Sequence, residues 1–153
     1  MTATDSIQAR LGRRFDPAEV RRIKRLWVRH SIAEDRRDID GLVATLTPDC
    51  VYEIAVTGQR WDGHDGARAF YSELFAAFPD NAFALSEIVI GPQGVFEVAT
   101  LTGTNEAPWA GMPPSGMAVA VEVLILFPWD PATGLFRGER IWFDRDPAPH
   151  DGG

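Results

Sequence analysis

One segment, residues 109–144, carries most of the information about the fold: WAGMPPSGMAVAVEVLILFPWDPATGLFRGERIWFD. A turn rich in proline and glycine precedes an apolar run over Val119–Phe127. A second turn, at Asp130–Gly134, leads into a strand-like run that ends at Asp144. Proline and glycine favour turns, whereas β-branched and aromatic residues favour strands. The segment therefore predicts two long strands joined as a hairpin, with a carboxylate at the end of the second.

The rest of the chain is predicted to form helices first and strands afterwards. Helical spacing and capping residues indicate helices at residues 17–35, from Asp38 or Asp40 to about 46, and from Asp65 to 78, and strand-like runs cover residues 50–56, 82–90 and 95–104. This order predicts an α+β fold in which a curved antiparallel sheet wraps around about three N-terminal helices and encloses a pocket. We expect a flexible leader at residues 1–16, one domain over residues 17–146 and a disordered tail at residues 147–153.

Composition excludes several classes of protein. The 153 residues carry a net charge of −7, which argues against binding to nucleic acid. No apolar run is long enough to span a membrane and no signal peptide is evident, so we expect a cytoplasmic protein. Cys50 is alone and cannot form an internal disulfide. The three histidines are scattered without ligand spacing, so we expect no metal, and we expect no cofactor.

The run Val119–Phe127 is apolar at positions that belong to both faces of a strand. An antiparallel strand with one solvated face should alternate, so its outer face is expected to be covered as well. A homodimer interface would provide that cover. Glu122 is the one charge in this run. It is expected either to form a structural ion pair with Arg140 across the hairpin or to be a second carboxylate in the pocket.

Asp144 is the first candidate for a catalytic group, because a carboxylate among apolar neighbours can have a raised pKa and act as an acid or base. If Asp144 faces the pocket, the period of a strand places Trp142 and Arg140 on the same side. Arg140 would then favour the ionised carboxylate. The alternative is a salt bridge to Arg140 or Arg145 at the end of the strand.

His30 shares a helical face with Ile23 and Trp27. It is expected to be either a core residue with a satisfied hydrogen bond or a donor to a developing enolate oxygen. The aromatic residues Tyr52, Trp61, Trp109 and Trp142 are core or rim residues that would suit a flat, apolar ligand. Asn105, just before the turn at residues 111–116, is expected at the mouth of the pocket.

Six short motifs occur in a characteristic order: Leu46-Thr47-Pro48-Asp49, Trp61-x-Gly63, Phe78-Pro79-Asp80, Gly103-Thr104-Asn105, Gly111–Gly116 and Arg140–Asp144. With this order the chain resembles the SnoaL-like branch of the NTF2-like superfamily. The resemblance implies a cone-shaped α+β fold. In the polyketide cyclases of this branch, an aspartate on the final strand is the acid/base group, and Asp144 matches it. Many of them carry a histidine where this chain has Asn105.

Ketosteroid isomerases look similar to residues 30–63. Their oxyanion-binding tyrosine falls at His30, and their base aspartate falls at Ile54, which cannot transfer protons. The isomerase mechanism is therefore not available in that form. The resemblance to the SnoaL-like branch implies cofactor-independent acid/base catalysis on a small hydrophobic carbonyl compound, with aldol ring closure as the leading example. The alternatives are hydration or dehydration by Glu122 beside Asp144, isomerisation, and binding of a small ligand without chemistry.

Overall fold

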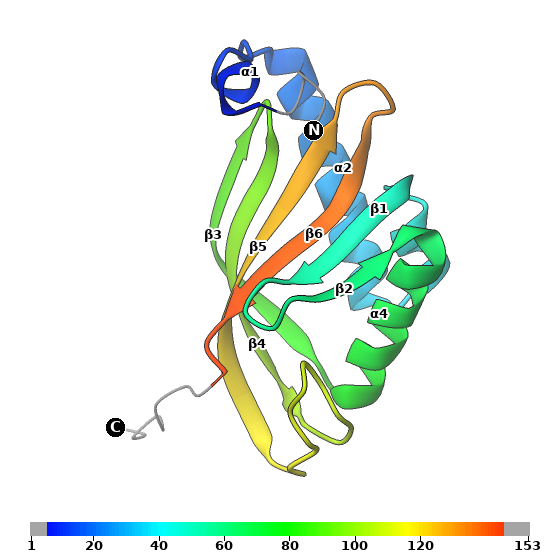
Figure 1. The fold of residues 1–153 in the computed structure, drawn as a ribbon. Coiled ribbons are helices and arrows are strands. Elements are labelled where there is room, and N and C mark those ends of the chain that lie inside the picture. The colour runs from blue at the N-terminus through cyan, green and yellow to red at the C-terminus, as the bar shows by residue number, and fades with distance from the viewer. Residues whose placement is uncertain (1–5, 146–153) are drawn as a thin grey trace.

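The computed structural model describes residues 6–145, which form four helices and one six-stranded sheet (Figure 1). The elements are α1 (Ile7–Leu11), α2 (Pro17–Asp35), α3 (Ile39–Val43), β1 (Leu46–Ile54), β2 (Gln59–Asp62), α4 (Gly63–Ala77), β3 (Ala82–Gly91), β4 (Gly94–Thr104), β5 (Ala118–Asp130) and β6 (Leu135–Phe143). The predicted α+β class is confirmed. The expected tail at residues 147–153 lies outside the described residues.

The sheet has the strand order β2-β1-β6-β5-β4-β3 and is strongly curved (Figure 1). Four of its five neighbouring pairs are antiparallel, but β1 and β6 run parallel. The sheet is therefore mixed, whereas the sequence predicted an antiparallel one. β1 and β6 are distant in sequence and no hairpin joins them, so no turn fixes the direction in which they pair.

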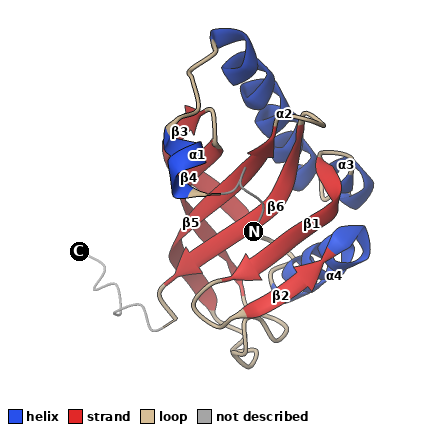
Figure 2. Ribbon diagram, turned by 45° about the horizontal axis from the view of Figure 1, so that its top comes forward, coloured by secondary structure: helices blue, strands red, loops and turns tan. Residues whose placement is uncertain are grey.

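Helices α2 and α4 cover the concave face of the sheet, as Figure 2 shows. α2 packs across β3 and β4, whereas α4 packs across β1 and β2. α2 begins where the sequence predicted, because Asp16 Oδ1 accepts the Ala18 amide at 2.8 Å and Pro17 occupies the first turn. Its buried face consists of Ile23, Leu26, His30 and Ala33.

Three boundaries differ from the predictions. α3 ends at Val43 and β1 already begins at Leu46, so Pro48 lies inside a strand. The strand tolerates it because the register with β6 shifts between Leu46 and Val51, which leaves Pro48 without a ladder partner. Asp65, the expected N-cap of α4, lies in its first turn, and Asp62 occupies the cap position. The short strand β2 was not predicted.

The segment expected as a flexible leader contains α1, all of whose residues are at least partly exposed. Next to it, Arg13 Nη1 donates to the Pro92 carbonyl at 3.2 Å, which connects this segment to the β3–β4 hairpin. Within residues 6–145 no helix is long and apolar enough to cross a membrane.

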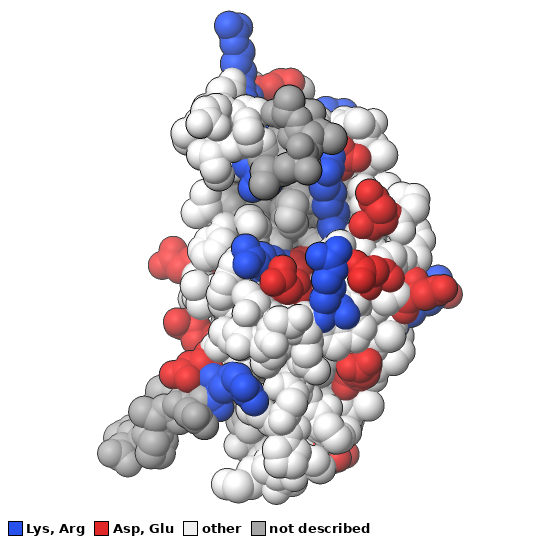
Figure 3. All heavy atoms as spheres, in the orientation of Figure 1, with Lys and Arg blue, Asp and Glu red and all other residues white. Residues whose placement is uncertain are grey.

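The outer face of the sheet, turned away from α2, carries both charged and apolar side chains. Figure 3 shows basic and acidic groups next to one another over β6 and β1, beside a wide uncharged area. Arg140 belongs to this face, where its Nε lies 3.3 Å from Glu53 Oε2. Its guanidinium lies 5.1 Å from the centre of the Trp142 ring. Ile141, which lies between Arg140 and Trp142 in the strand, points to the other side and lines the cavity.

Gly138 is required where β6 meets β1. Its φ is +111°, and a Cβ at this position would overlap the carbonyl of Val51. Only glycine permits both this backbone conformation and the close approach of the two strands. The next residue, Glu139, is buried and is 5% exposed.

Candidate active site

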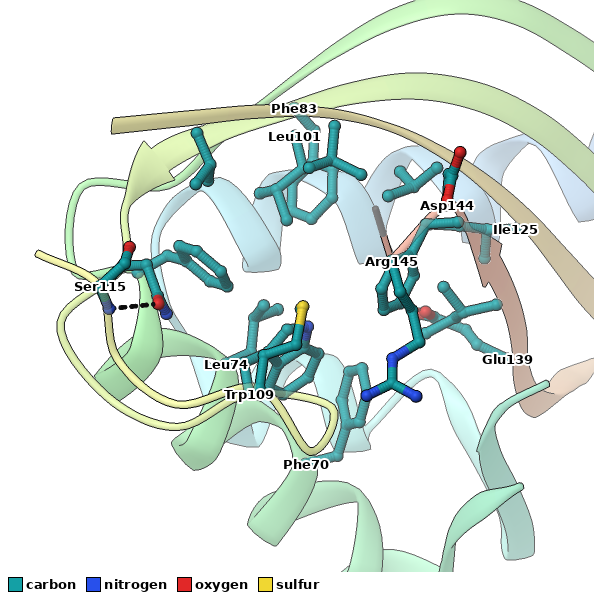
Figure 4. A pocket seen from close by; sticks show the side chains of 18 of the residues that line it. Phe70, Leu74, Phe83, Leu101, Trp109, Ser115, Ile125, Glu139, Asp144 and Arg145 are labelled. Atoms are coloured by element: carbon teal, nitrogen blue, oxygen red, sulfur yellow. Dashed lines mark hydrogen bonds between the residues drawn. The ribbon is translucent and has the colours of Figure 1, made fainter. Parts of the chain in front are cut away.

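A cavity of about 220 Å³ opens between the sheet, α4 and the C-terminal end of α2 (Figure 4). Most of its wall is apolar. The lining comprises Phe70, Leu74 and Phe78 from α4; Phe83, Leu101, Val119, Val121, Val123, Ile125, Ile141 and Phe143 from the sheet; and Trp109, Met112 and Pro113 from the loop before β5. A compact apolar compound suits such a wall, and the few polar groups in it would fix the compound's orientation.

The polar groups of the cavity lie in three places. Glu34 comes from the last turn of α2, and Glu139 comes from the middle of β6. Asn105 and Ser115 belong to the loop before β5, whereas Asp144 and Arg145 follow β6. Figure 4 shows the Asp144 carboxylate directed away from Glu139, and the Arg145 side chain extended toward Phe70 and Trp109.

Three polar contacts converge on Oε1 of Glu139. The Tyr71 hydroxyl donates to it at 2.8 Å, the Tyr52 hydroxyl lies at 3.2 Å, and His30 Nε2 lies at 3.0 Å. The two tyrosine hydroxyls are also 2.8 Å apart, and the Tyr71 hydroxyl lies 2.9 Å from His30 Nε2. These neighbours hold the carboxyl group of Glu139 in one orientation. Glu139 also lines the cavity.

The hydrogen bonds around His30 fix where its protons are. Thr45 Oγ1 donates to the Leu42 carbonyl at 2.6 Å, so at its 2.7 Å contact with His30 Nδ1 it accepts. Nδ1 therefore carries a proton. A second proton between Nε2 and Glu139 removes the repulsion that two facing lone pairs would have. The geometry thus favours a His30–Glu139 pair that holds one proton between its partners.

Glu34 has a pKa raised well above its ordinary value of 4.5, first because burial penalises the charged form and then because Glu139 and Glu97 lie nearby. The accessible surface of Glu34 makes it half-buried, because it borders the cavity. Burial and the charge of Glu139 also raise the pKa of Tyr52 and Tyr71 well above 10.0. Glu34 is therefore suited to remain protonated and to donate a hydrogen bond.

Glu97 is a third buried carboxyl group under α2. It is 8% exposed, and its Oε2 accepts a hydrogen bond from Trp27 Nε1 at 2.7 Å. Burial raises its pKa to about 7, the Trp27 hydrogen bond opposes this rise, and the charge of Glu139 adds to it. Glu97 does not line the cavity, so its effect there is electrostatic.

The Glu97→Gln variant is expected to change how stability depends on pH. Because the pKa of Glu97 rises from 4.5 in the unfolded chain to about 7 in the folded one, the folded state binds the proton more tightly. Stability is therefore lost as the pH rises from about 4.5 through 7. Glutamine retains the acceptor for Trp27 but does not ionise. Between pH 5 and pH 8 the variant should lose about 2 kcal/mol less than the wild type. Urea unfolding at both pH values measures this, and identical pH dependence would contradict it.

The loop between β4 and β5 closes one side of the cavity. Asn105 Oδ1 accepts the Ser115 amide at 2.9 Å, and Asn105 Nδ2 donates to the Ala107 carbonyl at 2.9 Å. Trp109 is 7% exposed and stacks on Trp61, with ring centroids 6.5 Å apart. Ala110, with φ at 51°, and Gly111, with φ at 76°, form the tight turn between Trp109 and Met112. Asn105 thus holds the loop in shape.

Comparisons with known proteins agree with this fold. The sequence model described as SnoaL-like polyketide cyclase matches residues 20–145. The chain belongs to the SnoaL-like polyketide cyclase family.

Solved structures include several similar chains. One from Jannaschia sp. CCS1, provisionally named a SnoaL-like polyketide cyclase, is 27% identical, with a TM-score of 0.69 over 87% of this chain and 92% of that one. A provisionally named hydroxylase from Streptomyces galilaeus is 20% identical, with a TM-score of 0.66 over 84% and 78%. A provisionally named ketosteroid isomerase from Kribbella flavida is 16% identical, with a TM-score of 0.64 over 86% and 84%. The latter two likenesses concern the fold alone. No curated protein matches the chain.

In this SnoaL-like chain, the predicted site residues fall into three groups. Asp144, Asn105 and Trp109 line the cavity. His30 and Tyr52 are fully buried behind Glu139, and Trp61 packs behind Trp109 and donates to Glu73 Oε1 at 3.2 Å. The remaining three, which are Glu122, Arg140 and Trp142, do not line it.

The expected pair between Glu122 and Arg140 is not formed. Arg140 lies opposite Leu126 and pairs with Glu53, whereas Glu122 is exposed and lies opposite Thr100 on β4. Arg140 and Trp142 were expected on the pocket side of their strand. This expectation is wrong, because the residues of β6 that line the cavity are Glu139, Ile141 and Phe143. Asp144 reaches the cavity because it follows the last residue of β6, where strand alternation no longer applies.

Sequence reasoning missed Glu34, Tyr71 and Glu139 as members of the site. Two signals were available. Glu34 follows His30 by one helical turn, and Glu139 alternates with Ile141 and Phe143. The second signal is ambiguous, because Arg140, Trp142 and Asp144 form an alternate set that also contains a large aromatic residue.

Proposed function

We propose that this SnoaL-like chain catalyses cofactor-independent acid/base chemistry on a small hydrophobic carbonyl compound in the cavity, with intramolecular aldol ring closure as the reaction. The observation that supports it most is the presence of two carboxyl groups, Glu34 and Glu139, in a wall that is mostly apolar. Their environments differ, since Glu34 has a strongly raised pKa and Glu139 is surrounded by hydrogen-bond donors. Such a difference assigns one group as acid and the other as base.

The proposed reaction proceeds in two steps. Glu139 takes a proton from the carbon next to a carbonyl group, while protonated Glu34 donates a hydrogen bond to the carbonyl oxygen as it becomes an enolate. The enolate carbon then attacks a second carbonyl carbon of the same molecule. A carbon–carbon bond forms, and the second carbonyl oxygen takes up the proton that Glu139 removed and becomes a hydroxyl group.

His30 acts in this proposal as a positioning residue. It is 0% exposed and does not line the cavity, so it reaches the substrate only through Glu139. Its Nε2 lies 3.0 Å from Glu139 Oε1, and that contact holds the carboxyl group in place for proton transfer. The role differs from the donation to an enolate oxygen that the sequence suggested for His30.

Three alternatives are tested alongside this proposal. Asp144 is the second candidate for the base, because it lines the rim of the same cavity and matches the position of the family's catalytic aspartate. Hydration or dehydration also needs paired carboxyl groups, and Glu34 with Glu139 supply a pair that Glu122 does not. A protein that binds its ligand without chemistry would show binding and no proton transfer.

Exchange of α-hydrogens for deuterium tests the proposal without knowledge of the natural substrate. 2-Tetralone is a compact, apolar ketone with acidic hydrogens next to its carbonyl group. In D₂O the wild type should accelerate deuterium incorporation, measured by mass spectrometry, by at least a hundredfold over buffer, on the order expected for a general base. Binding of 2-tetralone without accelerated exchange would support a binding protein instead.

We also propose that the chain is a homodimer in solution, joined through the outer face of the sheet. Val89, Phe96 and Leu126 lie side by side there across three strands, and Val89 is 64% exposed. An exposed apolar ladder of this kind favours burial against a second copy. Light scattering should give twice the chain mass of 16.9 kDa, and Phe96→Glu should give the monomer mass. A wild-type monomer would contradict this. The cytoplasmic location stays a prediction.

A further inference from the structure

The mouth of the cavity contains one basic side chain among the described residues, that of Arg145. Figure 4 shows it extended across the opening toward Phe70 and Trp109. Its Nη2 lies 3.6 Å from the position that a Cβ of Gly111 would occupy, so the guanidinium rests against the tight turn of the loop. The side chain thus belongs to the wall of the cavity.

Five other arginines of the described chain have a carboxylate partner on the surface: Arg22, Arg60, Arg68, Arg137 and Arg140. Within residues 6–145, no carboxylate oxygen lies within ion-pairing distance of the Arg145 guanidinium. A guanidinium group presents two parallel N–H donors that match a carboxylate. Arg145 is exposed at the mouth, so water moderates the strength of such a pair.

The interior of the cavity has the opposite preference. Glu34 and Glu139 lie there, and the negative charge of Glu139 already raises the pKa of its neighbours. An anionic group of a ligand would be repelled from this end and attracted to Arg145 at the mouth. A neutral carbonyl group would be accepted at the inner end, where a protonated Glu34 can donate to it.

We propose that Arg145 binds a carboxylate of the substrate, so that the substrate is a keto acid with its ketone near Glu139 and its carboxylate at the mouth. This inference rests on the proposed function for the position of the ketone. It assigns Arg145 to specificity and orientation, whereas proton transfer belongs to Glu139.

Two probes with the same acetophenone core test it by isothermal titration calorimetry: 4-acetylbenzoate, and 4′-methylacetophenone, in which a methyl group replaces the carboxylate. The wild type should bind 4-acetylbenzoate about tenfold more tightly, the order expected for a charge-assisted hydrogen bond. Arg145→Gln should remove this preference and leave the affinity for 4′-methylacetophenone within about twofold. Arg25→Gln is the matched control, because Arg25 is exposed on α2 and the change in net charge is the same.

Several results would overturn the inference. The first is a wild type that does not prefer 4-acetylbenzoate, including one that binds neither probe. The second is an equal loss of both probes in Arg145→Gln, which would indicate packing alone. The third is an equal loss of preference in Arg25→Gln, which would indicate an effect of net charge. Exchange of 2-tetralone that depends on Glu139, without any carboxylate preference, would overturn this inference and retain the proposed function. A carboxylate preference without exchange of 2-tetralone would retain this inference and overturn the proposed function.

Discussion

Glu139→Gln is expected to lower the rate of α-hydrogen exchange in 2-tetralone by about 10² to 10⁴, the range for loss of a general base. Glutamine has nearly the same shape and keeps an oxygen that can accept from Tyr71, which donates to Glu139 at 2.8 Å. It cannot take up the proton. Because the amide also changes the proton held with His30, circular dichroism and thermal unfolding should accompany the rate measurement.

Two matched variants make the result specific. Glu122→Gln removes a carboxylate that is exposed on the outer face, and it should leave the rate within about twofold. Asp144→Asn removes the carboxylate at the rim of the cavity. If Asp144→Asn lowers the rate by a hundredfold or more while Glu139→Gln does not, the base is Asp144 and the assignment of Glu139 is wrong.

Gly138→Ala is expected to lower the free energy of unfolding by about 3 kcal/mol or more. The new Cβ would overlap the Val51 carbonyl, and alanine at φ +111° adds backbone strain. Relief requires β6 to move away from β1, which would also displace Glu139. Urea unfolding measures the first effect, and α-hydrogen exchange in the fraction that still folds measures the second.

Gly58→Ala provides the control for this prediction. Gly58 also has a positive φ, of +73°, but nothing lies within 4 Å of the position of its Cβ. Its replacement should cost only about 1 kcal/mol, from the left-handed conformation alone. Equal losses in the two variants would show that the close approach of β6 to β1 contributes little to stability.

Most elements of the fold could be predicted because their signals are local. Asp16 and Pro17 start α2 at the residue that the capping rules predict, and the turns at Gly91–Gly94 and Asp130–Gly134 separate the long strands. β2 was missed because its four residues are too short for a strand pattern. The end of α3 was predicted at about residue 46, but the helix ends at Val43, and a shift of register lets Pro48 lie in β1.

The candidate site was predicted only in part, for a physical reason. His30, Tyr52 and Trp109 stand out as residue types with suitable chemistry, but Glu139 is one of many carboxylates until its surroundings are known. Those surroundings come from His30 on α2, Tyr52 on β1 and Tyr71 on α4, which are up to 109 positions away in the chain. No local pattern records such contacts.

The sequence by itself therefore determined the α+β class, the span of α2, the long strands and the family to which the chain belongs. Only the tertiary structure decided which face of β6 points inward and which carboxyl groups share the cavity. Both sets of alternating residues on β6 contain a large aromatic side chain, so hydrophobicity does not distinguish its faces. The face is decided by how β6 pairs with the neighbouring strands, among them β1, where Gly138 lies opposite Val51 although most of the chain separates the two strands.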